Sequence, residues 1–132
     1  MNLKKATKDS WKNYPMPELK AQLPIHRDFT PEEYEYLSYG DIPQQMEDKW
    51  FSYLQDDWLY FHRSWTGLCI FQVRLEKIGA SYRIGENWMN KDLEKGALFL
   101  NRNDSEVANI LLILIHGIIH RNSQKNSIAD LM

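Results

Sequence analysis

The chain has 132 residues, of which 43% are apolar and 13% aromatic, so it can form one packed domain and is too rich in aromatic residues for a disordered chain. Its formal net charge of −2 gives no electrostatic reason to expect a nucleic acid or an anionic membrane as partner. A single cysteine, Cys69, excludes an intramolecular disulfide and a cysteine-rich zinc site.

The sequence predicts a cytoplasmic protein. Several lysines stand near the first residue, but no apolar segment follows them, which argues against an ordinary secretory signal. The longest apolar stretch, 107–119, is shorter than the roughly 20 residues that a membrane-spanning helix needs. We therefore expect no membrane association.

The beginning of the chain is predicted to be an extended arm over residues 1–24, because three prolines there disfavour a regular helix. Residues 25–132 are expected to form a single α+β domain.

A short helix is predicted at the start of this domain. Thr30 is a good N-cap, Pro31 suits the first helical position, and Glu33 completes a capping box. Gly40 is expected to end the helix.

An antiparallel β-meander of about four strands is predicted next. Four runs rich in aromatic and β-branched residues occupy 48–55, 58–65, 68–77 and 80–84. The connections between them are short, whereas parallel pairing needs long crossovers. Turn residues separate the runs at Asp56-Asp57, Thr66-Gly67 and Ile78-Gly79.

A C-terminal helix is predicted from about Asp104 to about Arg121. Its polar residues fall on one narrow stripe: Asn109, His116 and His120. Because most of the remaining residues are apolar, the helix is expected to be largely buried on one face of the sheet.

The assumed turns decide which side chains share a face of the meander. With two-residue turns at Thr66-Gly67 and Ile78-Gly79, one face gathers three arginines, an amide and an indole, namely Arg63, Arg74, Arg83, Gln72 and Trp65. Guanidinium groups bind phosphate or carboxylate in a bidentate way, and an indole offers a stacking surface. Two arginines directly opposite each other repel unless an anion lies between them. The sequence therefore predicts a site for a nucleotide-like or phosphorylated anion.

This candidate site depends on the register. A change of one residue in either turn would send these side chains to opposite faces. The alternative is that the arginines pair with internal carboxylates or face water, as arginines in folded proteins commonly do.

His62 and Ser64 form a secondary candidate on the opposite, more apolar face. A histidine and a serine two residues apart on a strand suggest nucleophilic chemistry. Such a catalyst also needs a third group that orients the base, and none is evident in the sequence. A hydrogen-bonded core histidine is therefore the favoured interpretation.

His116 and His120 are one helical turn apart, which is the spacing of a metal-binding pair. However, no third ligand is evident, and Gly117 takes the position at which a zincin motif has its glutamate. No metal and no cofactor are therefore predicted.

The block DWLYFHRSWTG at 57–67, together with DKWF at 48–51, resembles a signature of small bacterial proteins of unknown function. The resemblance covers about residues 46–90. It implies a bacterial, cytoplasmic origin and transfers no catalytic residue.

Three functions follow from these observations. The first is a small binding module for a phosphorylated small molecule. The second is a protein-interaction module of the inhibitor or immunity type, whose contact surface would be the acidic segment 28–58, with nine acids against one lysine. The third is a small hydrolase of a nucleotide derivative that uses His62 and Arg63. The sequence favours binding over catalysis and leaves the oligomeric state open.

Overall fold

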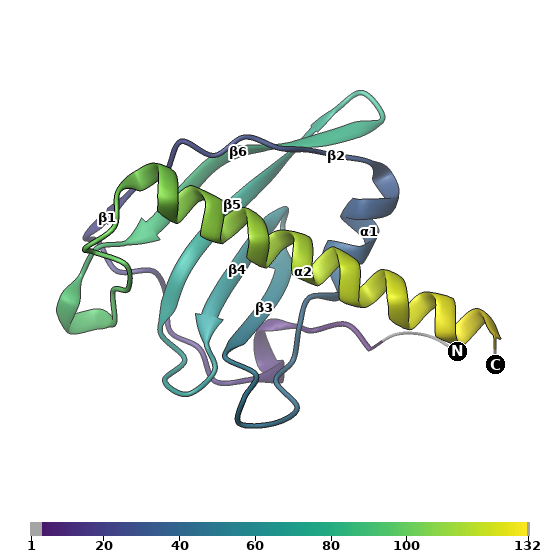
Figure 1. Cartoon of the computed structure of the whole chain (residues 1–132), viewed down its shortest axis with the longest axis horizontal. Coiled ribbons are helices and arrows are strands. Elements are labelled where there is room, and N and C mark those ends of the chain that lie inside the picture. Colours follow the sequence, from purple (N-terminus) through teal and green to yellow (C-terminus); the bar gives the residue numbers. More distant parts are fainter. Residues whose placement is uncertain (1–3, 132) are drawn as a thin grey trace.

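A computed structural model describes residues 4–131, and their side chains up to residue 127. Residues 1–3 and 132, at the ends of the predicted arm and domain, lie outside the described residues. The fold is α+β, as predicted, and combines one antiparallel sheet with two α-helices (Figure 1). The sheet has six strands instead of about four.

The strand order in the sheet is β1-β6-β5-β4-β3, and β2 also pairs with β6. The elements in chain order are the 3-10 helix η1 (Lys8–Ser10), β1 (Lys20–Ala21), β2 (Asp28–Phe29), α1 (Pro31–Tyr39), β3 (Trp50–Gln55), β4 (Trp58–Arg63), β5 (Cys69–Ile78), β6 (Ser81–Asn90), the 3-10 helix η2 (Leu93–Lys95) and α2 (Asp104–Leu131). The two strands that the prediction missed, β1 and β2, have two residues each, which is too short for a periodic sequence pattern.

The predicted capping of α1 is confirmed. The Thr30 hydroxyl accepts from the Glu33 backbone N–H at 3.0 Å, and the Glu33 carboxylate accepts from the Thr30 N–H at 3.0 Å. Gly40 ends the helix with φ +61°, and its N–H donates to the Leu37 carbonyl. A side chain at Gly40 would collide with the Ser52 carbonyl, so this position requires glycine.

The meander confirms one predicted turn and corrects another. Asp56 and Asp57 form the two-residue turn between β3 and β4, both with positive φ. The assumed turn at Thr66-Gly67 is wrong, because β4 ends at Arg63 and the Arg63 N–H donates to the Leu68 carbonyl at 3.0 Å. The connection therefore contains four residues, 64–67.

A β-bulge shifts the register further along β5. Phe61 lies opposite Phe71, whereas His62 lies opposite Cys69, so Ile70 is the extra residue. Leu59 consequently faces Val73, where the two-residue turn predicted Arg74. This single-residue shift exchanges the two faces of β5 relative to β4.

The turn between β5 and β6 also differs from the prediction. Ile78 pairs with Ser81, so the turn residues are Gly79 and Ala80 rather than Ile78 and Gly79. This turn aligns Arg83 with Glu76 instead of Arg74, and a second irregularity follows between Val73 and Leu75.

The sheet has two chemically different faces. The helix face packs against α2, which crosses it diagonally (Figure 1), and its core side chains are Leu59, Phe61, Phe71, Val73 and Leu75. The arm face is the opposite one, where the N-terminal arm lies, and its side chains include Tyr53, Tyr60, His62, Gln72 and Arg74. The predicted burial of the C-terminal helix on one face is confirmed. No helix in the described part of the chain is long and apolar enough to span a membrane.

Candidate functional site

The structure does not bring the five predicted ligand-binding residues together. Arg63 lies on the helix face, where its guanidinium sits 5.1 Å from the centroid of the Trp50 ring. Trp65 lies in the loop after β4, is 63% exposed, and donates from Nε1 to the Met46 carbonyl at 3.1 Å. Arg63 and Trp65 therefore do not share a surface with the other three predicted residues.

Gln72, Arg74 and Arg83 project from the arm face. Arg83 is aligned with Glu76 and forms an ion pair with it at 3.6 Å, so this guanidinium has an internal carboxylate. Arg74 lies opposite Trp58 and is exposed. Gln72 lines a cavity of the arm face.

That cavity, which we call the arm groove, has a volume of about 500 Å³. One wall comes from the arm, with Lys8 and the segment 13–16, and Lys20 also lines the cavity. The other wall is the sheet surface formed by Tyr53, Gln55, Tyr60, His62 and Gln72. The groove therefore joins a segment near the start of the chain to the middle of the meander.

Stacked rings form the sheet wall of the arm groove. Tyr53 stacks on Tyr60 with 4.8 Å between ring centroids and on His62 with 5.8 Å. Tyr53 and Tyr60 face each other across β3 and β4 because the Asp56-Asp57 turn fixes that register. Burial is the largest cause that raises the pKa of both tyrosines, so their hydroxyls stay protonated at neutral pH.

His62 is the most unusual residue of the groove. Its side chain is 1% exposed, and Nδ1 lies 3.0 Å from the Gly67 carbonyl oxygen. Because a carbonyl only accepts, this contact assigns the proton to Nδ1 and leaves a lone pair on Nε2. Nε2 is buried and has no hydrogen-bond partner among the described residues.

Burial also sets the charge of His62. Desolvation lowers its pKa below the ordinary value, and the hydrogen bond to Gly67 opposes this effect without cancelling it. The imidazole is therefore neutral at pH 7, and Nε2 acts as an acceptor. A buried acceptor without a donor costs about 1–3 kcal/mol.

The arm is held against the sheet by the loop that follows β4. The Trp11 indole N–H donates to the Ser64 carbonyl at 2.7 Å, and the Tyr14 backbone N–H donates to the Gly67 carbonyl at 2.9 Å. Ser64 is buried, and its hydroxyl donates to the Asp48 carbonyl at 2.7 Å. The predicted His62–Ser64 pair therefore has no hydrogen bond between its members, and Ser64 serves to position the loop.

The charge of the arm groove favours an anion. The described residues that line it include two lysines and no carboxylate. Lys20 also lies over the Trp88 ring, with its ammonium 4.4 Å from the centroid. Gln55 and Gln72 add amides that both donate and accept hydrogen bonds.

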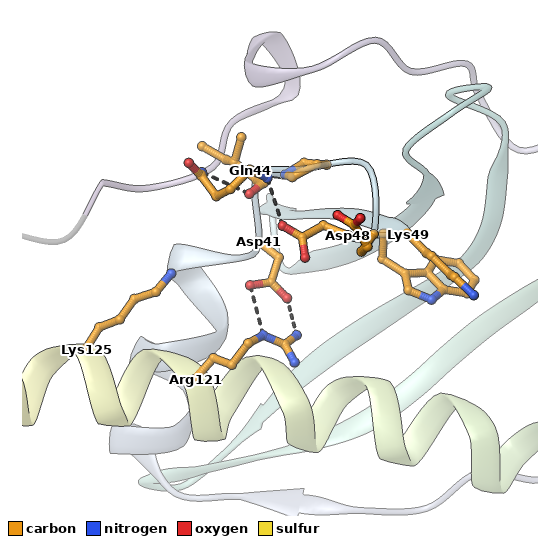
Figure 2. A pocket seen from close by; sticks show the side chains of 10 residues that line it. Asp41, Gln44, Asp48, Lys49, Arg121 and Lys125 are labelled. Atoms are coloured by element: carbon orange, nitrogen blue, oxygen red, sulfur yellow. Dashed lines mark hydrogen bonds and ion pairs between the residues drawn. The ribbon is translucent and has the colours of Figure 1, made fainter.

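A second cavity, of about 440 Å³, lies between the segment 41–50 and α2 (Figure 2). Arg121 points from α2 to Asp41 and forms an ion pair with it, and the Gln44 N–H donates to the Asp48 carboxylate at 2.9 Å. Three acids and three cations line this cavity, namely Asp41, Glu47, Asp48, Lys49, Arg121 and Lys125. Its charges balance and several of them are paired internally, so it offers less to a ligand than the arm groove does.

The acidic segment 28–58 is partly engaged in internal contacts. Glu33 pairs with Arg27 at 2.8 Å, and Asp57 accepts from the Tyr34 hydroxyl at 2.7 Å. Asp41 and Asp48 are occupied in the second cavity, as described above. Glu32 accepts from the Tyr36 hydroxyl at 3.2 Å, so five of the nine carboxylates have partners within the chain.

Cys69 and the histidine pair complete the list of candidates. Cys69 is 1% exposed, and burial raises the pKa of its thiol to about 12, so it is the inert core thiol that an apolar strand position suggests. Among the described residues, no group of three or more histidine, cysteine, aspartate or glutamate side chains could hold a metal ion.

Sequence reasoning missed most of the arm groove. Tyr53 and Gln55 were not singled out, although the Asp56-Asp57 turn places Tyr53 opposite Tyr60 and could have revealed the pair. The sequence suggested Trp11 and Tyr14 as anchors of the arm, but it could not place the arm on the sheet, because an arm without regular structure has no register. Comparisons with family models, with curated proteins and with solved structures found no match for this chain.

Proposed function

We propose that the chain is a small binding module whose site is the arm groove, and that its ligand is a planar anionic molecule of the nucleotide type. The observation that carries this proposal is the arm groove itself, whose described lining combines stacked rings, amides and two lysines with no carboxylate. The proposal keeps the ligand class inferred from the sequence and moves its site from the predicted arginine face to the arm groove.

The chemistry of the groove matches the parts of a nucleotide. The stacked Tyr53 and Tyr60 rings suit an aromatic base. The lysine ammonium groups suit a phosphate. The Gln55 and Gln72 amides suit the amino groups and sugar hydroxyls of nucleosides. A volume of about 500 Å³ is within the usual range for small-molecule sites.

Binding has more support than catalysis in this groove. The Nδ1 of His62 is hydrogen-bonded to a backbone carbonyl rather than to a carboxylate. The Ser64 hydroxyl donates to the Asp48 carbonyl. A nucleophile, its base and an orienting group are therefore not assembled around His62 in the described residues. The protein-interaction alternative has less support, because part of the acidic segment is occupied internally.

Thermal unfolding of the whole chain with a panel of ligands tests the proposal. The panel contains nucleoside mono-, di- and triphosphates, the matching nucleosides, and inorganic phosphate. We expect a rise in Tm with nucleotide concentration, and a smaller rise with nucleosides or phosphate, because a ligand selective for the native state stabilises it. The absence of any Tm shift across the panel would contradict the proposal.

Two variants locate the binding site. Gln72→Leu removes an amide from the groove, and the loss of one hydrogen bond is expected to weaken binding by about 0.5–1.5 kcal/mol. Trp65→Ala removes an exposed ring of the predicted arginine face and should leave binding unchanged. The reverse pattern would return the site to the face that the sequence suggested.

A further inference from the structure

Two histidines lie side by side on the outer side of α2, away from the arm groove. His116 and His120 are both exposed, with 6.2 Å between their ring centroids and 17° between the ring planes. The opposite side of the helix is buried in the core through Leu111, Ile115 and Ile118. The helix is therefore fixed by packing, and it presents both imidazoles to solvent from adjacent turns.

We propose that His116 and His120 form half of a binding site for a divalent transition metal such as zinc, and that a second copy of this chain supplies the other half. Two imidazoles at positions i and i+4 of a helix can bind one ion, as in helical zinc motifs. Neutral imidazole nitrogens are good ligands for zinc, nickel and copper.

One chain cannot complete the coordination shell from its described residues. A structural zinc site needs four ligands, and the helix pair supplies two. The described part of the chain contains no group of three or more histidine, cysteine, aspartate or glutamate side chains that could hold a metal ion. In the proposed site, the remaining protein ligands come from another molecule.

A second copy fits this requirement by symmetry. In a twofold dimer the same patch meets itself, so one histidine pair meets an identical pair and four imidazoles can surround one ion. Ile113 lies one turn before His116, is 69% exposed, and would be covered in the same contact. The adjacent cation, Arg121, is turned toward Asp41 and paired with it, so its charge is partly neutralised.

Light scattering of the whole chain with added zinc chloride tests the proposal. We expect the mass to rise from one chain to two as zinc approaches half an equivalent, and chelation by EDTA to reverse the change. Titration calorimetry should give one zinc per two chains. An unchanged mass in zinc, or one zinc bound by each single chain, would overturn the proposal.

Variants assign the effect to the helix. His116→Asn and His120→Asn should each abolish the zinc-dependent doubling, whereas the exposed His26, replaced by Asn, should leave it intact. Circular dichroism would verify that all three variants are folded. Zinc-dependent doubling in the variant that carries both His116→Asn and His120→Asn would contradict the assignment. The response to nucleotides should be unchanged in that variant, so the two proposals can fail independently.

Discussion

At the scale of single residues, the Gly67 carbonyl links His62, in the arm groove, to the N-terminal arm. Its oxygen accepts from His62 Nδ1 at 3.0 Å and from the Tyr14 N–H at 2.9 Å. Gly67 has φ +79°, and a Cβ there would lie 3.0 Å from the Lys12 carbonyl oxygen. Glycine is therefore needed both for the turn and for the close approach of the arm. One residue thus fixes the tautomer of His62 and the position of the arm.

The lowered pKa of His62 predicts how stability depends on pH. Below the unfolded-state value of about 6.5, the unfolded chain binds a proton that the buried imidazole resists. The free energy of unfolding should therefore fall as the pH drops from about 6.5 toward the folded-state pKa, by at most about 1.4 kcal/mol per pH unit from this residue. Urea unfolding at a series of pH values measures the slope.

A variant isolates this contribution from that of the other titrating groups. Glutamine at position 62 does not titrate, and its amide can still donate to the Gly67 carbonyl. The difference in unfolding free energy between the chain and His62→Gln should therefore become smaller as the pH falls below about 6.5. A difference that stays constant with pH would show that the folded-state pKa of His62 is not lowered.

At the scale of elements, the two helices and the four long strands were predictable, whereas the two short strands and the pairing of β4 with β5 were not. Local signals identified α1 from its capping residues and the four long strands from aromatic and β-branched runs. The register depended on the number of residues in one connection and on a bulge at Ile70. No local pattern distinguishes a two-residue turn at Thr66-Gly67 from the four-residue loop that forms. The loop shifts the register by two residues and keeps the faces, whereas the bulge shifts it by one, so the bulge separated Arg63 from Gln72 and Arg74 and removed the predicted site.

A contact with α1 explains why the C-terminal helix continues through a polar sequence. The prediction ended this helix near Arg121, whereas α2 extends to Leu131. Asn122 is 2% exposed, and its amide donates to the Tyr36 carbonyl at 2.9 Å and to the Gly40 carbonyl at 3.1 Å. These bonds satisfy carbonyls at the end of α1, so the two helices stabilise each other.

This contact leads to a prediction for stability. Asn122→Ala removes the hydrogen bonds to the Tyr36 and Gly40 carbonyls, and it should lower the free energy of unfolding by roughly 1–3 kcal/mol. Asn109→Ala, at an exposed position of the same helix, should change it by less than about 0.5 kcal/mol. Denaturant unfolding of both variants gives the comparison, and equal effects would mean that Asn122 does not join the helices in solution.

At the scale of the whole molecule, the two faces of one sheet have different coverings. A packed helix covers one face, and the N-terminal arm lies on the other (Figure 1). The arm groove lies between this arm and the sheet. The groove combines residues 8–16 with strand positions between 53 and 72, which are far apart in the sequence. Such a site is a property of the assembled chain, and local sequence patterns could not predict it.

An NMR titration of the isotope-labelled chain with the nucleotide that gives the largest thermal shift tests the binding site most directly. The account predicts that the largest signal changes occur at Tyr53, Tyr60, His62 and Gln72, with the outer side of α2 unchanged. Changes confined to Arg63 and Trp65, or to the surface of α2, would contradict it.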